Sequence, residues 1–408
     1  MTALSAQPLL SARPGARPVV RLRDAKQLRV LNGHPWIFSN EIEMDAATSA
    51  LEPGAVVRVQ RHNGGPVGTA IFNPHTLIAA RMLARDSDLE VDQAWLAGRL
   101  ARAIDVRSRL FDRPYYRLVH AEADDLPGLV VDRYGDVLVV QANTAGMDRL
   151  LPMLLPALTD LVRPRAIALR NDSSARALEG LAEEVRWATE PVVGPIRIEE
   201  AGATFFADVM AGQKTGWFYD QRDNREFLAG LSSGMRVLDA YTHTGGFAVR
   251  CARAGATAVV ALDRSEPALA LAAQAAEASG VGTKCTFQRA EVFEELERKA
   301  TAGERFDLVI ADPPAFVKSK RDLDTGLRGY RKLARLAAAV TAPQGFLAIA
   351  SCSHNVPAEV FQEQVARGIH DARRAGRIVR SAGAAPDHPV HPLLPESAYL
   401  KMLVLALD

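Results

Sequence analysis

The second half of the chain alternates short apolar runs with alanine-rich amphipathic stretches. After Met235 the apolar runs are RVLDAY, AVVALD, KCTFQ, FDLVIAD and GFLAIAS. This alternation is typical of an α/β protein with a parallel, doubly wound sheet. A last apolar run, Tyr399–Asp408, follows His391, Pro392 and Pro395 closely. The nearby prolines favour one more buried strand over a helix there.

The first half has a different pattern. Between Val19 and Leu83, alternating stretches such as Pro53–Gln60 are separated by turn signals such as Asn63–Gly65. Short strands at this spacing predict a small β-barrel. Between Asp88 and Phe111 the pattern becomes helical, with apolar residues recurring every four positions at Leu96, Leu100 and Ile104.

A small central α/β unit is predicted after this helix. Its elements are two strands within Leu126–Gln141 joined at Tyr134-Gly135-Asp136, a helix at Met147–Val162 and a strand at Ala166–Leu169. A separate hairpin is predicted at Pro195–Val209, with its turn near Ala201-Gly202. The 408 residues therefore divide into a flexible tail (1–18), the barrel (19–88), the central domain (89–190) and the parallel sheet with its N-terminal hairpin (191–408).

Composition and charge exclude several classes of protein. Lys and Arg number 49 against 48 Asp and Glu, so a net charge of +1 neither favours nor excludes a nucleic-acid partner. Cys251, Cys285 and Cys352 form no CxxC pair, which argues against a disulfide framework or a cysteine zinc site and fits a reducing compartment. We expect no metal. No apolar run reaches the roughly 18 residues of a membrane helix, and the N-terminus lacks the charge order of a secretory signal. We therefore expect a cytoplasmic protein without a membrane partner.

Acidic residues stand at the ends of three successive predicted strands. The carboxyl ends of parallel strands form the ligand crevice of such sheets. Asp239 ends the first strand, Asp263 is placed to accept hydrogen bonds from ribose hydroxyls, and Glu291 to lie near an adenine amino group. Gly245 and Gly246 would let a ligand approach the first strand-to-helix turn. Each acid alone could equally cap a helix, but their order favours a ligand site.

The fourth strand of the predicted sheet ends in Asp312-Pro313-Pro314. Each proline fixes its own φ and restrains the residue before it, so this turn is rigid and suited to holding a planar base. The stretch Val317–Lys332 follows, with six Lys and Arg against two Asp and with Tyr330 among them. Its basic side chains, which include Lys318, Lys320 and Arg321, would either contact phosphates or form a solvated helix face.

Cys352 stands at the carboxyl end of the fifth strand, where side chains point into the crevice. This position favours a nucleophile, whereas Cys251 and Cys285 fall in a helix and a strand and are interpreted as small core residues. His354 could tune the thiol by its charge, or could cap a helix or pack.

In this order the motifs resemble the class I S-adenosylmethionine-dependent methyltransferases, and more narrowly the PUA-domain-containing 23S rRNA 5-methylcytosine methyltransferases. The similarity runs over almost the whole chain from Val19. Besides DPPAFVKSK and SCSHN, it is carried by Asn32–Ile42, Ala121–Asp136, Gly212–Arg225 and Asp387–Leu405. The resemblance implies a PUA-like barrel that binds RNA and a Rossmann-like methyltransferase domain. It also implies an S-adenosylmethionine pocket lined by Lys214, Thr215, Arg222, Asp239, Gly245, Asp263 and Glu291, the last of which stands where the family usually has aspartate.

The resemblance further implies a mechanism and a partner. Cys352 would add to C6 of a cytosine in ribosomal RNA, so that C5 can accept a methyl group, and Asp312 would hold the base or assist proton transfer. Pro313, Pro314, Lys318, Lys320 and Arg321 would contact the RNA. The turn after Asp312 has no second cysteine, so release must use a base or water. A homodimer is plausible by family, although no feature of the sequence indicates one.

Three other functions are compatible with parts of this pattern. An RNA N-methyltransferase acting on guanine or adenine would use Asp-Pro-Pro without needing a cysteine. A non-catalytic RNA-binding assembly factor would keep the fold without the activity. A small-molecule methyltransferase fits poorly with the two upstream domains and the basic stretch.

Overall fold

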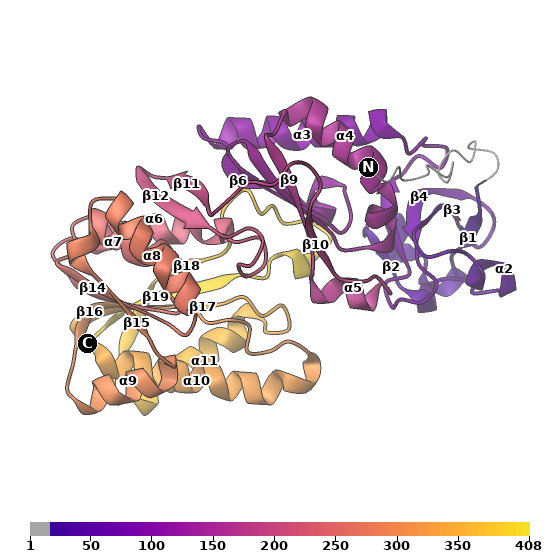
Figure 1. Cartoon of the computed structure of the whole chain (residues 1–408). Coiled ribbons are helices and arrows are strands. Elements are labelled where there is room, and N and C mark those ends of the chain that lie inside the picture. Colours follow the sequence, from indigo (N-terminus) through magenta and orange to yellow (C-terminus); the bar gives the residue numbers. More distant parts are fainter. Residues whose placement is uncertain (1–16) are drawn as a thin grey trace. The chain divides into compact units, whose positions relative to one another are not determined.

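The computed structural model describes residues 17–408, so most of the tail predicted for residues 1–18 lies outside the described residues. The described chain divides into two units. One contains residues 17–193 and Pro389–Ser397, and the other contains Gly194–His388 and Ala398–Asp408. Figure 1 shows the elements of each unit along the chain. Within residues 17–408, no helix combines the length and the apolar character needed to cross a membrane.

The second unit is built on a seven-stranded sheet with the order β15-β14-β13-β16-β17-β19-β18. The order changes direction between β13 and β16, the position where doubly wound sheets bind ligands. Its strands are β13 (Arg236–Ala240), β14 (Ala258–Asp263), β15 (Cys285–Arg289), β16 (Phe306–Ala311), β17 (Thr341–Ser351), β18 (Gly376–Ala382) and β19 (Lys401–Leu407). The predicted hairpin precedes the sheet as β11 (Ile196–Glu200) and β12 (Ala203–Ala207).

Helices cover both faces of this sheet (Figure 1). One face carries α6 (Arg222–Leu231), α7 (Gly246–Arg253) and α8 (Glu266–Ala278), and the other α9 (Val292–Thr301), α10 (Leu323–Val340) and α11 (Ala358–Asp371). Leu238, Val309 and Leu347 on the central strands are completely buried. Burial on both faces explains why these strands are continuous apolar runs in the sequence. Helices α10 and α11 approach closely, and a Cβ at Gly368 would lie 2.4 Å from the carbonyl oxygen of Arg331.

The sheet is not parallel throughout, which corrects one expectation. β19 is antiparallel to both of its neighbours, β17 and β18. The strand predicted at Tyr399–Asp408 is confirmed as β19. The apolar pattern does not predict β18, because most of its side chains are exposed, Ile378 and Val379 among them. An edge strand without a buried face lacks the continuous apolar run by which a buried strand is recognised.

The first unit begins with a five-stranded sheet of order β1-β3-β4-β5-β2. Its strands are β1 (Val19–Arg21), β2 (Trp36–Ile37), β3 (Ala55–Gln60), β4 (Pro66–Phe72) and β5 (Ala80–Ala84). Val57, Val59 and Phe72 belong to its buried core. Two short helices, α1 (Leu28–Leu31) and α2 (Ala46–Ser49), occur within this part and are not predicted by its strand-like pattern.

A second five-stranded sheet follows, with the order β10-β9-β8-β7-β6. Its strands are β6 (Tyr115–His120), β7 (Leu129–Tyr134), β8 (Val137–Ala142), β9 (Ala166–Asn171) and β10 (Glu184–Trp187), and its helices are α3 (Gln93–Leu110), α4 (Ala145–Val162) and α5 (Ser174–Leu178). The predicted hairpin, second helix and third strand are confirmed as β7–β8, α4 and β9. Helix α3 begins after Asp92 because this residue caps it, accepting a hydrogen bond from the Trp95 amide at 2.7 Å.

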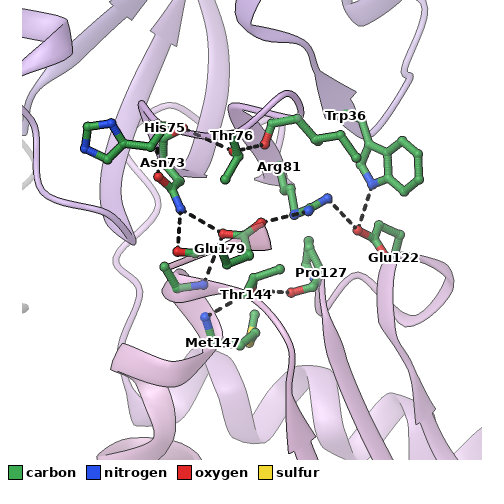
Figure 2. Close-up of polar contacts among 12 residues, drawn as sticks. Trp36, Asn73, His75, Thr76, Arg81, Glu122, Pro127, Thr144, Met147 and Glu179 are labelled. Atoms are coloured by element: carbon green, nitrogen blue, oxygen red, sulfur yellow. Dashed lines mark hydrogen bonds and ion pairs between the residues drawn. The ribbon is translucent and has the colours of Figure 1, made fainter. Parts of the chain in front are cut away.

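A buried polar network joins the two sheets of the first unit (Figure 2). Arg81 on β5 pairs with Glu179 at 2.9 Å and with Glu122 at 3.6 Å. The indole N–H of Trp36 donates to Glu122 at 2.7 Å, and the Asn73 side-chain amide donates to the Glu179 carboxylate at 3.0 Å. One arginine therefore holds two carboxylates that come from the neighbouring sheet and its connections.

Candidate active site

Four of the residues singled out from the sequence lie at the carboxyl ends of strands in the seven-stranded sheet. Strands β13, β14, β16 and β17 run parallel, so their carboxyl ends meet there. Asp239 and Asp263 lie at the ends of β13 and β14, and Asp312 and Cys352 directly follow β16 and β17. Three carboxyl groups and one thiol are thereby gathered on the side of the sheet where ligands bind.

Asp239 is a buried carboxylate with one oxygen left over. Its Oδ2 accepts hydrogen bonds from the Thr242 hydroxyl at 2.6 Å and the Ala248 amide at 2.9 Å. Its Oδ1 has no hydrogen-bond partner among residues 17–408. Burial, assisted by the negative charge of Asp263, raises the pKa of Asp239 to about 7. A buried acceptor without a donor is costly, so this oxygen is suited to a ligand that brings a donor or a positive charge.

The loop after β13 adopts left-handed backbone conformations. The φ values of Tyr241 and His243 are 67° and 52°, a region that costs a non-glycine residue about 1–2 kcal/mol. The His243 amide donates to Asp263 at 2.9 Å, which helps to hold the loop. Burial lowers the pKa of His243 to about 4, so its imidazole is neutral. Gly245 ends the loop at a φ of 82°. Backbone strain of this kind occurs mainly at functional sites.

Asp263 and Glu291 differ in their surroundings. Asp263 accepts hydrogen bonds from the amides of His243 and Ser265, both at 2.9 Å, and its remaining lone pairs can still accept from a ligand hydroxyl. Glu291 is exposed and forms the N-cap of α9 without a capping hydrogen bond from its side chain. Burial and the charge of Glu291 raise the pKa of Tyr241, so Glu291 acts on the same loop.

The segment before the sheet carries three further predicted cofactor residues. Lys214 is exposed, Thr215 is buried and Arg222 is half-buried. The segment is held by the buried ion pair of Arg225 and Glu200, with two contacts of 2.6 and 2.7 Å. Although burial opposes ionisation of Glu200, the Arg225 charge and hydrogen bonds outweigh it and lower the pKa of Glu200. This pair fixes the segment against the β11–β12 hairpin.

Asp312 lies near two other carboxyl groups. The Gln221 amide donates to its Oδ2 at 2.9 Å. Burial and the charges of Asp220 and Asp239 raise the pKa of Asp312 to about 7. Near neutral pH both forms of this carboxyl group are populated. Asp312 can therefore donate a hydrogen bond to a base in one form and accept one in the other.

The Cys352 thiol lies beside the Asp-Pro-Pro turn. Its Sγ is 4.0 Å from the carbonyl oxygen of Pro313. Burial raises the pKa of Cys352, the charge of Lys214 opposes this, and the charges of Asp312 and Asp220 add to it. The raised pKa favours the protonated thiol over the thiolate.

The other two cysteines and His354 are in surroundings that indicate packing and not catalysis. Burial raises the pKa of Cys251 to about 12 and that of Cys285 to about 11. Cys251 is fully buried in α7, as a core residue should be, whereas Cys285 is half-buried at the start of β15. The ring of His354 packs against that of Tyr399, with centroids 5.0 Å apart.

The basic stretch separates into exposed cations and a buried tyrosine. Lys318, Lys320, Arg321 and Pro314 are exposed, while Pro313 is buried. Tyr330 does not lie among the cations, because α10 turns it toward the sheet. Its hydroxyl lies 2.8 Å from each of the hydroxyls of Ser351 and Ser353, on either side of Cys352. Sequence reasoning missed this hydroxyl cluster.

Sequence reasoning also missed Asp220, Gln221, Tyr399 and Lys401. The Tyr399 hydroxyl donates to Asp220 at 2.5 Å, and Lys401 begins β19 beside the end of β17. All four fall within the motif stretches Gly212–Arg225 and Asp387–Leu405. A motif stretch alone does not show which of its side chains lie in the site. No group of three or more His, Cys, Asp or Glu side chains in the described part of the chain could hold a metal ion.

Comparisons with known proteins give two family matches. A model described as PUA-like domain matches residues 20–85, and one described as S-adenosylmethionine-dependent methyltransferase matches residues 175–400, more than half of the chain. The chain belongs to the S-adenosylmethionine-dependent methyltransferase family. The family resemblance inferred from the motifs is thereby confirmed, as are the fold class and the cofactor.

Relatives of this methyltransferase extend over nearly the whole chain. It is 35% identical to the ribosomal RNA large subunit methyltransferase I of Pseudoalteromonas atlantica over 94% of this chain and 98% of that one. It is 37% identical to the protein of the same name from Aeromonas hydrophila, over 95% of this chain and 98% of that one. A solved protein from Streptococcus mutans shares the fold, with a TM-score of 0.80 and 18% identity over 95% of this chain and 100% of that one.

The residues at the sheet edge fit S-adenosylmethionine, whose ribose hydroxyls and ammonium group are donors and whose adenine is planar. The unpartnered Oδ1 of Asp239 and the remaining lone pairs of Asp263 would accept from such donors. The left-handed Gly245 lets the loop pack directly against α8, since a Cβ there would lie 2.9 Å from the Cβ of Ala272. The individual roles in cofactor binding stay predictions for all seven residues, Lys214, Thr215, Arg222, Asp239, Gly245, Asp263 and Glu291.

We expect Asp239→Asn to weaken cofactor binding while stabilising the free protein above neutral pH. The raised pKa means that folding costs up to about 4 kcal/mol once Asp239 is ionised. Folded Asp239 keeps its proton up to about pH 7, whereas the unfolded one loses it near pH 4. The cost therefore grows as the pH rises between these values. Asparagine cannot ionise, so the variant avoids this cost. Its buried, unpaired N–H group costs about 1–3 kcal/mol instead, which reduces the net gain.

The measurements are the melting temperature of both proteins from pH 5 to pH 8 and calorimetric titration with S-adenosylmethionine. The variant should gain in melting temperature relative to wild type as the pH rises, and its Kd should increase about 100-fold, or about 2.7 kcal/mol. A constant difference in melting temperature across this range would contradict the raised pKa of Asp239.

Proposed function

We propose that this enzyme transfers a methyl group from S-adenosylmethionine to C5 of a cytosine in 23S ribosomal RNA, through a covalent adduct of Cys352 with C6. The names of its relatives, both ribosomal RNA large subunit methyltransferase I, support large-subunit ribosomal RNA as the substrate. The observation that carries the cytosine-5 assignment is the thiol of Cys352, whose Sγ is 4.0 Å from the carbonyl of Pro313, next to Asp312. An N-methyltransferase needs no nucleophile at this position.

The chemistry explains why a thiol is needed. C5 of cytosine is a poor nucleophile, and a bond from the Cys352 thiolate to C6 makes it enamine-like. The bound cofactor supplies the methyl group as an electrophile carried on a sulfonium. Loss of the C5 proton to a base or water then forms the C5–C6 double bond again and breaks the C6–S bond, which frees Cys352. Asp312 would donate to the ring nitrogen in its acid form, or accept from the amino group when ionised.

The domain division predicted from the sequence assigns the remaining roles. Residues 19–88 would bind structured RNA by shape and phosphate contacts, residues 191–408 would carry the chemistry, and 89–190 would connect them. The target cytosine would be unstacked into the site, with Pro313, Pro314, Lys318, Lys320 and Arg321 contacting the RNA. A cytoplasmic location and a homodimer stay predictions.

The test is product identification. Purified wild-type enzyme would be incubated with S-adenosylmethionine and undermodified large-subunit ribosomal RNA, and the nucleosides analysed by mass spectrometry. We expect 5-methylcytidine. A methylated guanosine or adenosine instead would assign an RNA N-methyltransferase. Absence of any product, together with failure to bind the cofactor, would support a non-catalytic assembly factor.

A further inference from the structure

Lys401 lies next to the turn that carries Cys352. It is the first residue of β19 and pairs with Ser351, the last residue of β17. Its side chain is half-buried, and its ammonium donates to the carbonyl oxygens of Ser353 at 2.7 Å and of Val356 at 2.9 Å. An ammonium has three N–H donors, so these two carbonyls leave one donor available.

The two carbonyls belong to the turn between β17 and α11. Such carbonyls have no partner within a strand or a helix. The Ser353 carbonyl accepts one hydrogen bond inside the turn, from the Val356 amide at 3.2 Å, and its second lone pair takes a partner from elsewhere. Lys401 supplies it from one side. From the other side the Ser353 hydroxyl accepts a hydrogen bond from the Val317 amide at 3.3 Å and contacts the Tyr330 hydroxyl at 2.8 Å. Cys352 is therefore fixed between a buried hydroxyl cluster and a lysine.

Charges of both signs surround the Cys352 thiol. Lys214 favours its ionisation, and Asp312 and Asp220 oppose it. The buried phenol of Tyr330 also interacts with it. Burial lowers the pKa of Lys401, and the charge of Cys352 opposes that decrease. Lys214 is exposed, so it is more easily screened by solvent and salt than the half-buried Lys401.

We propose that Lys401 is a positioning residue for Cys352: its ammonium holds two carbonyls of the turn Ser353–Val356 and adds a second positive charge, besides that of Lys214, next to the turn that carries the thiol. The proposal rests on the proposed role of Cys352 as the nucleophile. It predicts that loss of this lysine makes the thiol less reactive without removing the RNA or cofactor sites.

The test is the alkylation of Cys352 by iodoacetamide from pH 6 to pH 10, followed by peptide mass spectrometry, which separates Cys352 from Cys251 and Cys285. In Lys401→Gln and Lys401→Met we expect alkylation at pH 8 to slow about tenfold and its midpoint to rise by about one pH unit, as for removal of one nearby charge. Lys401→Arg keeps the charge and should stay within about threefold of wild type.

Lys299→Gln is the matched control. Its side chain is buried, forms ion pairs with Glu295 and Glu304, and lies on α9. This variant should alkylate as wild type does. In methyl transfer, Lys401→Gln should lower kcat about tenfold and leave the KM values for RNA and cofactor within about twofold, because the lysine acts on the nucleophile and not on binding.

A reciprocal measurement does not depend on the folding of the Lys401 variants. In protein with isotope-labelled lysine, the Lys401 resonance would be titrated in wild type and in Cys352→Ser. Linkage requires that loss of the thiolate lowers the pKa of Lys401. An unchanged lysine titration, or unchanged Cys352 alkylation in a folded Lys401→Gln, overturns the proposal. The alkylation assay uses no RNA, so its result does not depend on the proposed function. Failure of wild type to form 5-methylcytidine would contradict the proposed function alone.

Discussion

Cys352→Ala is expected to abolish methylation of RNA while leaving the fold intact. Without the thiolate, C5 stays a poor nucleophile, and loss of a covalent nucleophile commonly costs at least about 10⁴-fold in kcat. The thiol is half-buried and its contact with the Pro313 carbonyl is weak at 4.0 Å, so removing it should change stability by less than about 1 kcal/mol. The readout is 5-methylcytidine formed per enzyme under single-turnover conditions.

Cys285→Ala is the control for this variant. Cys285 is also half-buried but lies at the start of β15, and its loss should leave the rate within about twofold, as for a surface-proximal substitution. An RNA that carries 5-fluorocytidine cannot lose a proton from C5. It should therefore stay covalently attached to wild type and to Cys285→Ala, but not to Cys352→Ala. Undiminished methylation by Cys352→Ala would rule out the covalent mechanism and leave an N-methyltransferase as the better assignment.

Arg81→Met should destabilise the first unit by about 3–5 kcal/mol. Its guanidinium holds two carboxylates, those of Glu122 and Glu179, whose side chains are 11% and 6% exposed. The methionine leaves both charges buried without a cation (Figure 2). Hydrogen exchange of peptides spanning β5, β7 and α5 in the full-length chain would measure the loss, because it reports opening of this unit separately from the other.

The control is Arg109→Met, which removes an exposed arginine from α3 in the same unit. Arg109 pairs with Asp105 at 3.0 Å, and both side chains are more than half exposed, so the change should be below about 0.5 kcal/mol. Arg81→Lys keeps the charge but not the fork that reaches two partners, and an intermediate loss is expected. Equal exchange in Arg81→Met and wild type would mean that the network contributes no net stability.

The strand and helix pattern was predictable where burial is simple. The central strands of the large sheet are buried on both faces and were recognised as apolar runs, whereas the edge strand β18 was not, because Ile378 and Val379 are exposed. The start of α3 differs from the expected one because a single capping residue, Asp92, sets it. Edges and caps depend on one or two side chains, and a periodic pattern does not register them.

The candidate site was predictable as a set of positions but not as a chemical environment. Asp239, Asp263, Asp312 and Cys352 were found because the carboxyl ends of parallel strands share one edge of the sheet. The raised pKa values of Asp239 and Asp312, both about 7, arise from burial by several segments and from nearby carboxylates, Asp263 for Asp239 and both Asp220 and Asp239 for Asp312. No single stretch of sequence contains this information.

The sequence by itself therefore determined the α/β class, the succession along the chain of the strands that carry the site, the family and its cofactor, because each depends on local patterns and on short motifs. Only the tertiary structure decided which groups surround the thiol. Lys401 and Ser353 are 48 residues apart and are brought together by the antiparallel pairing of β17 with β19. Tyr330 turns inward because α10 packs against the sheet. Contacts across strands depend on register and packing, which act over the whole fold and leave no signal at the positions that they join.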